Sequence, residues 1–412
     1  MKTTLILPFI IFISICCSVS CENNSGEIPI INIDNPTGAV ALHISDILDD
    51  ITIVPLETRD DVLLSFRTPF IITAHYILAQ TEERLLQFDR QGKFIRVLAT
   101  NGNGPNEYNA ILHPLVDEDL ELLYYVDYRN QGTIASIHLR TGAFLGPFTP
   151  DLQPFSIHEI DSDGYIYGFR PSLYNFWSDD YEPSSGPRET PVLAYRYHPQ
   201  SSDLILFNGT HSFEGGYTSE VAGGSRMFKR DNHIYFIILN YSDTLYRVEG
   251  SKIVPHSVFN LKNKTTHPRY GGSSLRFHFA CQQGIMFSKV EQKFSFKENG
   301  TVSASVGNPS FLFLDNNNIL CKVNSITIDP LGVTINMDGF LTIEGRNTPT
   351  SKIPNITGLY GHLKIEAYDL IALINNTLKD NRISNDLRKQ FEELSTTLHE
   401  DDNPVLIIGK VK

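Results

Sequence analysis

The sequence predicts an all-β fold of the propeller type, and three observations support this prediction. From about Ile51 to Phe340 the chain consists of short, alternating apolar runs separated by Gly, Asp, Asn and Pro, which is typical of strands joined by turns. One hydrophobic phrase recurs in this stretch every 40–50 residues, roughly, as expected where each repeat forms one sheet. A last apolar run, Val405 to Val411, stands far in sequence from any neighbour and therefore predicts closure of a ring.

Composition is compatible with this prediction. The 412 residues are 41% hydrophobic and 20% charged, which indicates a globular chain with a large core. The length alone would also be compatible with two or three domains, but a repeated β architecture of this length can form a single domain. The formal net charge of −13 repels phosphate backbones, so we expect no nucleic acid partner.

The recurring phrase contains a hydrophobic strand, a polar break, a second strand, a turn and a third strand. Its two clearest copies open 46 residues apart, at Tyr76 and Leu122. Further copies open at Tyr165, His233 and Gly284; the third carries a Pro/Ser-rich insertion and the fifth has lost most of the turn signal. In the first copy we expect a hairpin turn at Phe88–Phe94, where Asp89 bonds the turn backbone and Gly92 supplies a positive φ.

The run Gly102-Asn-Gly-Pro-Asn-Glu-Tyr108 has three interpretations. A phosphate cradle is disfavoured because no helix follows and Pro105 removes an amide donor. A tight crossover between two blades is favoured, with Tyr108 packing back onto the core. A third interpretation places Glu107 or Asn103 at a binding mouth on one face of the propeller, since loops on a rigid scaffold often carry sites.

Helical spacing replaces the strand pattern near the C-terminus. Apolar residues recur at helical intervals from about Leu363 to Leu398, which predicts two helices broken near Asn381 to Asn385. We expect the strand that follows Asn403 to return to the first sheets and complete a blade, because an open sheet edge would promote aggregation.

The N-terminus resembles an export signal. Residues 1–20 hold one Lys, an apolar run and a small-residue tail, which predicts a signal peptide. Val19-Ser20-Cys21 resembles the lipobox of bacterial lipoproteins, so we expect lipidation at Cys21 and a polar tether over 21–45, with the folded domain over 46–412. Simple secretion and an uncleaved anchor are the alternatives.

Two cysteines, Cys281 and Cys321, fall in the expected domain. They could form one disulfide in an oxidising compartment or remain two buried thiols, and the sequence favours neither. No Cys/His spacing matches a zinc site, and we expect no cofactor or metal.

Several of these motifs together resemble one family. The lipobox, Val54-Pro-Leu-Glu-Thr58, the Phe88 turn, the Gly102 run and Asn403-Pro-Val-Leu406 look like those of the six-bladed β-propeller lipoproteins of Bacteroidota, which are similar to NHL-repeat and TolB-type propellers. The resemblance implies six blades closed by the C-terminal strand, with the helical segment of about 363–398 before it. It implies an envelope location and, because most members have no known activity, little about function.

Candidate site residues lie at strand ends and in one aromatic loop. Arg170, Tyr174, Trp177 and Tyr181 suit sugar or peptide recognition, although the loop could instead clamp a neighbouring blade. Glu107 and Asp127 are further candidate ligand contacts. Asp161 and Asp163 are interpreted as turn residues, since other calcium ligands are missing. Six residues could act as acid or base if they met in one channel, but each is interpreted first as a satisfied strand-end group: Glu57, Asp127, His138, His158, His233 and His278.

The sequence thus favours a monomeric, lipid-anchored propeller at the outer membrane, periplasmic or surface-exposed. Its expected role is a binding or scaffold module for a glycan, a peptide or an envelope protein, because the repeats are complete and no catalytic motif is assembled. A hydrolase or lyase with a metal in the central channel is the alternative from another class. A purely structural partner of an outer-membrane transporter is a third hypothesis.

Overall fold

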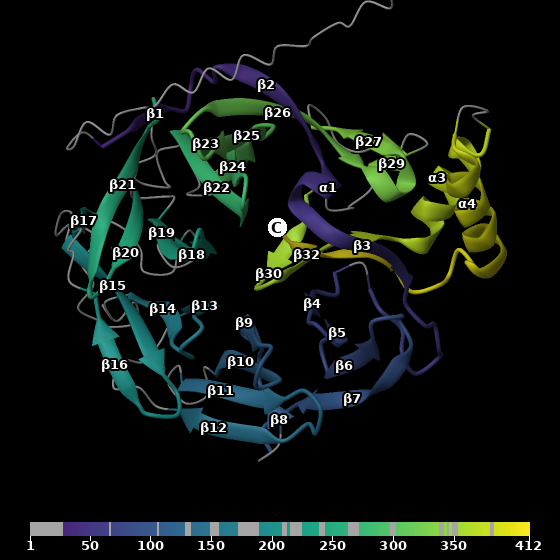
Figure 1. Cartoon of the computed structure of the whole chain (residues 1–412), viewed down its shortest axis with the longest axis horizontal. Coiled ribbons are helices and arrows are strands. Elements are labelled where there is room, and N and C mark those ends of the chain that lie inside the picture. Colours follow the sequence, from purple (N-terminus) through teal and green to yellow (C-terminus); the bar gives the residue numbers. More distant parts are fainter. Residues whose placement is uncertain are drawn as a thin grey trace, which may run out of the picture.

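The structure is a computed structural model. It describes residues 28–65, 67–104, 107–127, 133–148, 156–171, 189–207, 212–214, 225–238, 244–262, 272–296, 302–337, 342–343, 346–347, 353–379 and 383–412. Within these residues, strands form six sheets of four or more strands and a two-stranded ribbon. The sheets stand around a central opening, so the predicted all-β propeller arrangement is confirmed (Figure 1).

Five of the sheets are built around consecutive strands. The first sheet holds β4 (Phe70–Ile72), β5 (Tyr76–Gln80), β6 (Arg84–Asp89), β7 (Phe94–Asn101) and β8 (Glu107–Tyr108). The second sheet holds β9 (Leu112–Asp117), β10 (Leu122–Asp127), β11 (Thr133–His138) and β12 (Phe144–Phe148). The third sheet holds β13 (Ser156–Ile160), β14 (Ile166–Pro171), β15 (Glu189–His198), β16 (Asp203–Leu206) and β17 (Ser212–Glu214).

The fourth and fifth sheets each gain an outer strand from the N-terminus. The fourth sheet holds β18 (Ser225–Arg230), β19 (His233–Ile238), β20 (Thr244–Glu249), β21 (Lys252–Asn260) and, outermost, β1 (Ile30–Asn32). The fifth sheet holds β22 (Gly272–Cys281), β23 (Gly284–Phe296), β24 (Val302–Val306), β25 (Ser310–Asp315), β26 (Leu320–Ile328), β27 (Val333–Asn336) and β2 (Gly38–His43). Strands β1 and β2 pair in parallel with β21 and β26 and so cover two exposed edges.

The remaining sheet combines a strand from the N-terminal part of the chain with the C-terminal strand, and we name it the closing sheet. It holds β3 (Leu48–Pro55), β32 (Val405–Val411), β31 (Tyr360–Ile365) and β30 (Asn355–Thr357), in that order from outside to inside. The C-terminal strand β32 lies between β3 and β31 and pairs antiparallel with both. The expected return of the C-terminus into a sheet therefore occurs. The two-stranded ribbon is β28 (Thr342–Ile343) with β29 (Arg346–Asn347).

Hydrophobic clusters lie between neighbouring sheets all the way round the ring. Ile71 of the first sheet shares a cluster with Tyr125 of the second. Phe70 of the first sheet shares another with Leu406 of the closing sheet. Four further clusters join the second sheet to the third, the third to the fourth, the fourth to the fifth and the fifth to the closing sheet. Each sheet thus buries both faces against its neighbours, as period-two alternation predicts.

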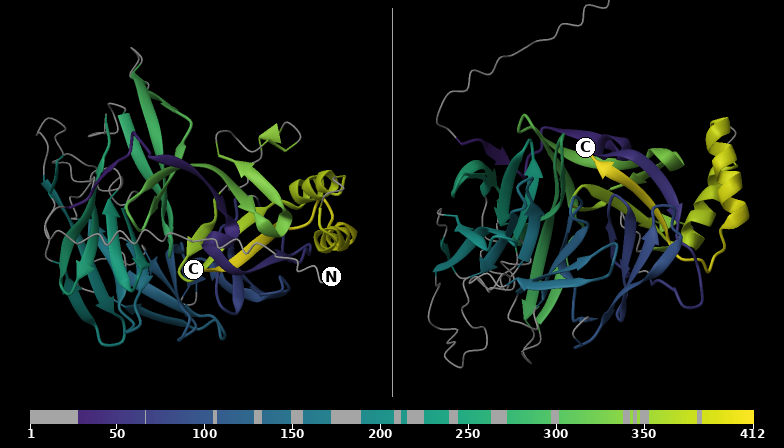
Figure 2. Two further views of the ribbon diagram at one scale, coloured as in Figure 1. Left: turned by 45° about the horizontal axis from the view of Figure 1, so that its top comes forward. Right: turned by 60° about the horizontal axis from the view of Figure 1, so that its bottom comes forward.

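Several short helices lie beside the closing sheet. Helix α3 (Ala367–Thr377) and helix α4 (Asn385–Thr397) connect β31 to β32 and project from the ring (Figure 2). Leu370 and Phe391 face inward and join the cluster between the fifth and closing sheets. Helix α1 (Ile44–Ile47) links β2 to β3, and the 3-10 helix η3 (Asp329–Leu331) follows β26.

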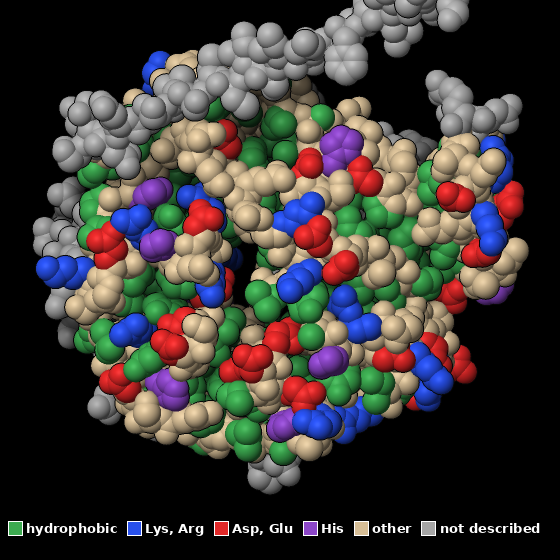
Figure 3. All heavy atoms as spheres, in the orientation of Figure 1, with side chains coloured by type: hydrophobic (Ala, Val, Ile, Leu, Met, Phe, Trp, Pro, Cys, Tyr) green, Lys and Arg blue, Asp and Glu red, His purple; other side chains and the backbone are tan. Residues whose placement is uncertain are grey.

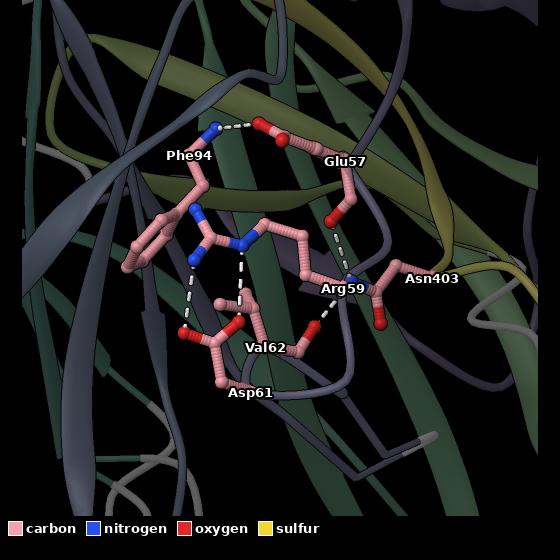
Figure 4. Close-up of polar contacts among 6 residues, drawn as sticks. All are labelled: Glu57, Arg59, Asp61, Val62, Phe94 and Asn403. Carbon is pink, nitrogen blue, oxygen red and sulfur yellow. Dashed lines mark hydrogen bonds and ion pairs between the residues drawn. The ribbon is translucent and has the colours of Figure 1, made fainter.

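The loop before the first sheet is fixed to the start of β32 by Asn403. This side chain is 3% exposed, and its Nδ2 donates hydrogen bonds to the carbonyl oxygens of Glu57, at 2.8 Å, and Val62, at 2.7 Å (Figure 4). Its Oδ1 accepts from the amide of Leu64 at 2.9 Å, and its own amide donates to Thr58 Oγ1. We name Asn403 with residues 57–64 the latch, because it holds the ring closed.

The latch also reaches the first sheet. Glu57 Oε2 accepts a hydrogen bond from the amide of Phe94 at 2.8 Å, and the Arg59 guanidinium lies 5.0 Å from the Phe94 ring centroid. Arg59 forms a bidentate ion pair with Asp61 (Figure 4). The Glu57 carboxylate, one of the acid–base candidates, is therefore a structural group.

The predicted turn at Gly92 is confirmed. Gly92 has a φ of 84°, and Asp89 Oδ1 accepts from the amides of Gln91 and Lys93. The turn packs against the end of β3 so closely that a Cβ on Gly92 would lie 2.1 Å from the carbonyl oxygen of Pro55. Glycine is required here for its conformation and for the close approach.

Two boundaries differ from the sequence predictions. The tether expected over 21–45 contains β1 and β2, which are paired in sheets, so the described part of that segment is not a linker. The helical segment begins at Ala367 rather than Leu363, because Leu363 belongs to β31. The helical segment predicted from the sequence included the end of this strand, because a buried apolar run fits both the helical and the strand period.

Candidate functional site

A large cavity occupies the centre of the ring. It has a volume of about 1560 Å³ and is lined by residues from all six sheets. The innermost strands β4, β9, β13, β18, β22 and β30 surround the opening (Figure 1). The face drawn in Figure 3 is hollowed at its centre, with acidic and basic side chains around the hollow. The fold therefore provides a channel large enough for a ligand rather than a filled core.

Three innermost strands carry a β-bulge, and each bulge contains a histidine. Leu115 and Leu112 of β9 pair with Tyr124 and Val126 of β10. Two residues of β9 therefore lie opposite a single residue of β10, and His113 is one of the two. His158 is the extra residue of β13, and His278 is the extra residue of β22. Side chains of a regular inner strand point alternately at the two neighbouring sheets, whereas a bulge re-aims one side chain. All three histidines line the cavity.

The first two bulge histidines lie side by side across a sheet boundary. The ring centroids of His113 and His158 are 5.6 Å apart and meet edge to face. Phe169 also contacts the His158 ring edge to face, with centroids 5.3 Å apart, and Ser156 Oγ lies 3.0 Å from His158 Nε2. His113 has a φ of 51°, a left-handed conformation that costs energy outside glycine. Strain of this kind is retained where the side chain must point in one direction.

Arg226 lines the same cavity from the next innermost strand, β18, which has a regular register. Burial and, as the smaller cause, the charge of Arg226 together lower the pKa of His113 to about 4. Burial and then Arg226 also hold the pKa of His158 well below its usual range. Both imidazoles are therefore neutral at neutral pH, and Arg226 supplies the positive charge of this group. Burial lowers the pKa of Arg226 itself.

Glu159 follows His158 and behaves as a neutral acid. Burial raises the pKa of its carboxyl to about 8, although a backbone hydrogen bond from Lys229 and the charge of Lys229 oppose the rise. At neutral pH the carboxyl is thus mostly protonated and can donate a hydrogen bond. Asp161 and Asp163, further along, form the turn predicted for them: Asp161 Oδ1 accepts from the amides of Asp163 and Tyr165.

Two more histidines line other parts of the channel wall. His278 Nε2 lies 2.9 Å from Ser288 Oγ, and burial, with the charge of Arg276, lowers its pKa to about 4. His362 of β31 is 5% exposed, and burial lowers its pKa to about 4. Its Nδ1 has no hydrogen-bond partner among the described residues. A ligand or solvent in the channel would satisfy that atom.

The chemistry of this wall suits binding. Within the described ranges, no group of three or more His, Cys, Asp or Glu side chains is placed to hold a metal ion. The channel instead combines neutral imidazoles, a guanidinium, a protonated carboxyl and aromatic rings such as Phe277. These are hydrogen-bonding and stacking groups for an organic ligand.

The sequence-predicted ligand contacts do not meet in this channel as far as it is described. Glu107 Oε2 accepts from the amide of Gly104 at 2.6 Å, so its carboxylate folds onto its own loop, and Tyr108 is buried as the crossover interpretation requires. Asp127 is buried at the end of β10. Neither lines the cavity. Arg170 belongs to β14, and Tyr174, Trp177 and Tyr181 lie outside the described residues.

Other candidates have local roles. His138 Nδ1 accepts from the amide of Arg140, and His233 Nδ1 lies 2.7 Å from the carbonyl oxygen of Asp231, so both are turn groups. Cys281 and Cys321 are both free thiols in the structure, the first buried and the second half-buried. Cys21 lies outside the described residues.

Sequence reasoning named His158 and His278 but missed their neighbours in the wall: His113, Glu159, Arg226 and His362. His113-Pro114 carried a usable signal, because proline inside a strand indicates an edge or a bulge. The bulges at His158 and His278 have no such mark in the sequence. Among the described residues, no helix is long and apolar enough to span a membrane.

Comparison with solved structures supports the fold. A protein of Bacteroides fragilis NCTC 9343, named as an exported protein, is 15% identical with a TM-score of 0.54, over 93% of this chain and 100% of its own. TolB from Acinetobacter baumannii is 12% identical with a TM-score of 0.34, over 82% and 64% of the two chains. An ulvan lyase of polysaccharide lyase family PL25 is 14% identical with a TM-score of 0.34, over 62% and 66%. Only the first likeness is strong enough to bear on the fold, and none bears on activity.

Comparison by sequence gives the family. No curated protein sequence matches this chain at a significant level. Residues 28–410 match the family described as Domain of unknown function (DUF4934), and the match spans every described sheet. This chain therefore belongs to the DUF4934 family.

Proposed function

We propose that this protein is a lipid-anchored, six-bladed propeller of the cell envelope that binds a glycan, a peptide or an envelope protein in its central channel. The observation that carries the proposal is the cavity of about 1560 Å³ whose wall holds three histidines on bulges. Bulges cost ladder hydrogen bonds, and a fold that needed only stability could keep regular inner strands. Three bulges at one channel favour a binding role for the side chains they re-aim.

The proposed blade count is supported by the hydrophobic clusters. Five blades correspond to the five sheets of consecutive strands, and the closing sheet is the sixth. Six clusters, each between two neighbouring sheets, fit a ring with six interfaces. A ring of six sheets also leaves the open centre that the binding role needs.

The proposed anchor and location are supported by the N-terminal sequence. Cys21 precedes β1 by a short polar segment, which would tether the ring close to a membrane. The Bacteroides fragilis protein of similar fold is named as exported, in line with an envelope location.

The aromatic loop remains part of the proposed site. Its flanking residues Pro171 and Val192 pair with each other beyond Phe169, at the end of the third sheet where β13 begins with Ser156. His113 and Arg226 also lie near the beginnings of their strands. We therefore keep Tyr174, Trp177 and Tyr181 as proposed ligand contacts, since aromatic side chains suit sugar or peptide recognition.

Binding can be tested with the full chain on glycan and peptide arrays, followed by calorimetry of each hit. His278→Trp adds bulk inside the channel and should abolish binding, because the ligand occupies that space. His233→Trp places the same bulk on an exposed turn outside the channel and should leave affinity unchanged. Hits that bind both variants equally well, or arrays without any hit, would contradict the proposal.

A further inference from the structure

We propose that the channel holds a carboxylate of its ligand in a subsite formed by Arg226, His113 and His158, at the meeting of β18, β9 and β13. This inference rests on the proposed function and specifies the chemistry that the channel recognises. We name these three residues the anion subsite.

The geometry brings the subsite together from three sheets. Strand β13 packs between β9 and β18. The rings of His113 and His158 lie 5.6 Å apart, and both feel the charge of Arg226. All three side chains line the same cavity. Two of them stand at bulges of their strands, while Arg226 comes from a strand of regular register.

The electrostatics of the subsite favour a negatively charged group. Arg226 is a cation in a poorly solvated place, where an anion would replace the water that burial removed. The two imidazoles are neutral, so they offer N–H donors without adding charge. Arg226 therefore brings one positive charge to a subsite whose other two side chains are neutral.

The neighbouring acid does not oppose an anion. Glu159 lies directly beside His158, and an ionised carboxylate there would repel the ligand. Because burial raises the pKa of Glu159 to about 8, this group is mostly neutral at neutral pH and can donate rather than repel. The planar guanidinium fork also matches the two oxygens of a carboxylate.

Such a carboxylate could come from a uronic acid in a glycan or from the end of a peptide. Calorimetry on the full chain at neutral pH distinguishes the sources with two pairs of probes: trigalacturonic acid against galactotriose, and acetyl-trialanine against its amide. We expect the charged member of one pair to bind at least about tenfold more tightly than its neutral partner, as a charge-assisted hydrogen bond implies. The pair that shows this preference identifies the source.

Variants assign the preference to the subsite. Arg226→Gln should reduce it by about tenfold, and His158→Phe, which keeps an aromatic ring against Phe169, should weaken it in the same direction. Arg247→Gln is the matched control, because Arg247 lies on β20 of the same sheet but does not line the channel. It removes the same charge and should leave the preference unchanged. Thermal melting of each variant shows whether it is folded, and His158→Phe tests the subsite should Arg226→Gln unfold.

The outcomes separate this inference from the proposed function. Equal binding of charged and neutral probes, or a preference that survives both Arg226→Gln and His158→Phe, would overturn the subsite and leave the channel as a binding site. Failure of all four probes while array hits still depend on the channel would overturn the subsite in the same way. Failure of the probes and of the arrays would overturn both.

Discussion

The latch and the anion subsite both bury polar side chains, but they treat them in opposite ways. The side chain of Asn403 in the latch forms three hydrogen bonds with neighbouring backbone groups. The histidines of the channel point into a cavity, and their strands give up regular pairing to place them there. The comparison teaches that a buried polar group supports closure where the protein satisfies it, and indicates binding where the fold aims it at open space.

The largest effect is expected at the latch. Asn403→Ala would leave two backbone carbonyls and one amide without their partners, which should lower the free energy of unfolding by about 2–4 kcal/mol. Chemical denaturation measures the loss. Asn376→Ala, on the exposed face of α3, is the control and should change stability by less than about 0.5 kcal/mol. Equal effects of the two changes would remove the distinction between latch and surface.

Gly92→Ala tests the contact between the first and closing sheets. A side chain at a φ of 84° is strained, and its Cβ would lie 2.1 Å from the carbonyl oxygen of Pro55. We expect a loss of about 2–3 kcal/mol by denaturation. Gly250 has a φ of 60° and open space where a Cβ would lie. Gly250→Ala should therefore lower the free energy of unfolding by only about 1 kcal/mol. The difference between the two variants measures the close approach, and no difference would mean that the sheets do not press together here.

Glu159→Gln tests the channel side of the comparison through pH. A carboxyl whose pKa rises from 4.5 to about 8 on folding stabilises the fold fully below 4.5, and this contribution is lost as the pH rises towards 8. The glutamine variant should therefore match the native chain near pH 4.5 and become more stable towards pH 8, by less than the roughly 5 kcal/mol that the full pKa shift implies, because Glu159 is only half-buried.

Melting curves at several pH values measure the change caused by Glu159→Gln. Glu400→Gln, on an exposed turn, is the control and should show no such trend. A stability difference that is independent of pH would show that Glu159 ionises normally, and would remove one support of the anion subsite.

The smallest effect is expected where β2 meets η3. His43 Nδ1 lies 2.6 Å from Asp329 Oδ1, and this hydrogen bond raises the pKa of the exposed histidine from 6.5. Burial would raise the pKa of Asp329, but hydrogen bonds from His43 and Ser45 outweigh it and lower the pKa from 3.8. The pair therefore stabilises the fold between these two values, and its contribution fades as the pH rises through the pKa of His43 or falls through that of Asp329.

His43→Gln should accordingly lower the melting temperature most near pH 5 and not measurably in alkaline solution. Lys252→Gln, at the exposed start of β21, is the control and should show no such dependence on pH. A constant difference between His43→Gln and the native chain at every pH would show that the ion pair is not formed.

The sequence predicted the repeats well because strands and turns are local. The turn at Gly92, the burial of Tyr108 and the return of the C-terminal strand follow from alternation, glycine and spacing, which act over a few residues. It did not predict that β1 and β2 join sheets from within the expected tether, since parallel pairing over more than 200 residues leaves no local mark. The candidate site was predicted less well: the named carboxylates Glu107 and Asp127 do not line the channel, while His113 and Arg226, which do, were not named.

The amino-acid pattern alone therefore determined the all-β class, the turns and the closing strand, because hydrophobic periodicity and turn chemistry are properties of neighbouring residues. Tertiary structure decided which polar groups face the channel. A bulge arises from the register between two strands, and the meeting of His113, His158 and Arg226 requires three sheets at once, so no short stretch of the chain contains the information.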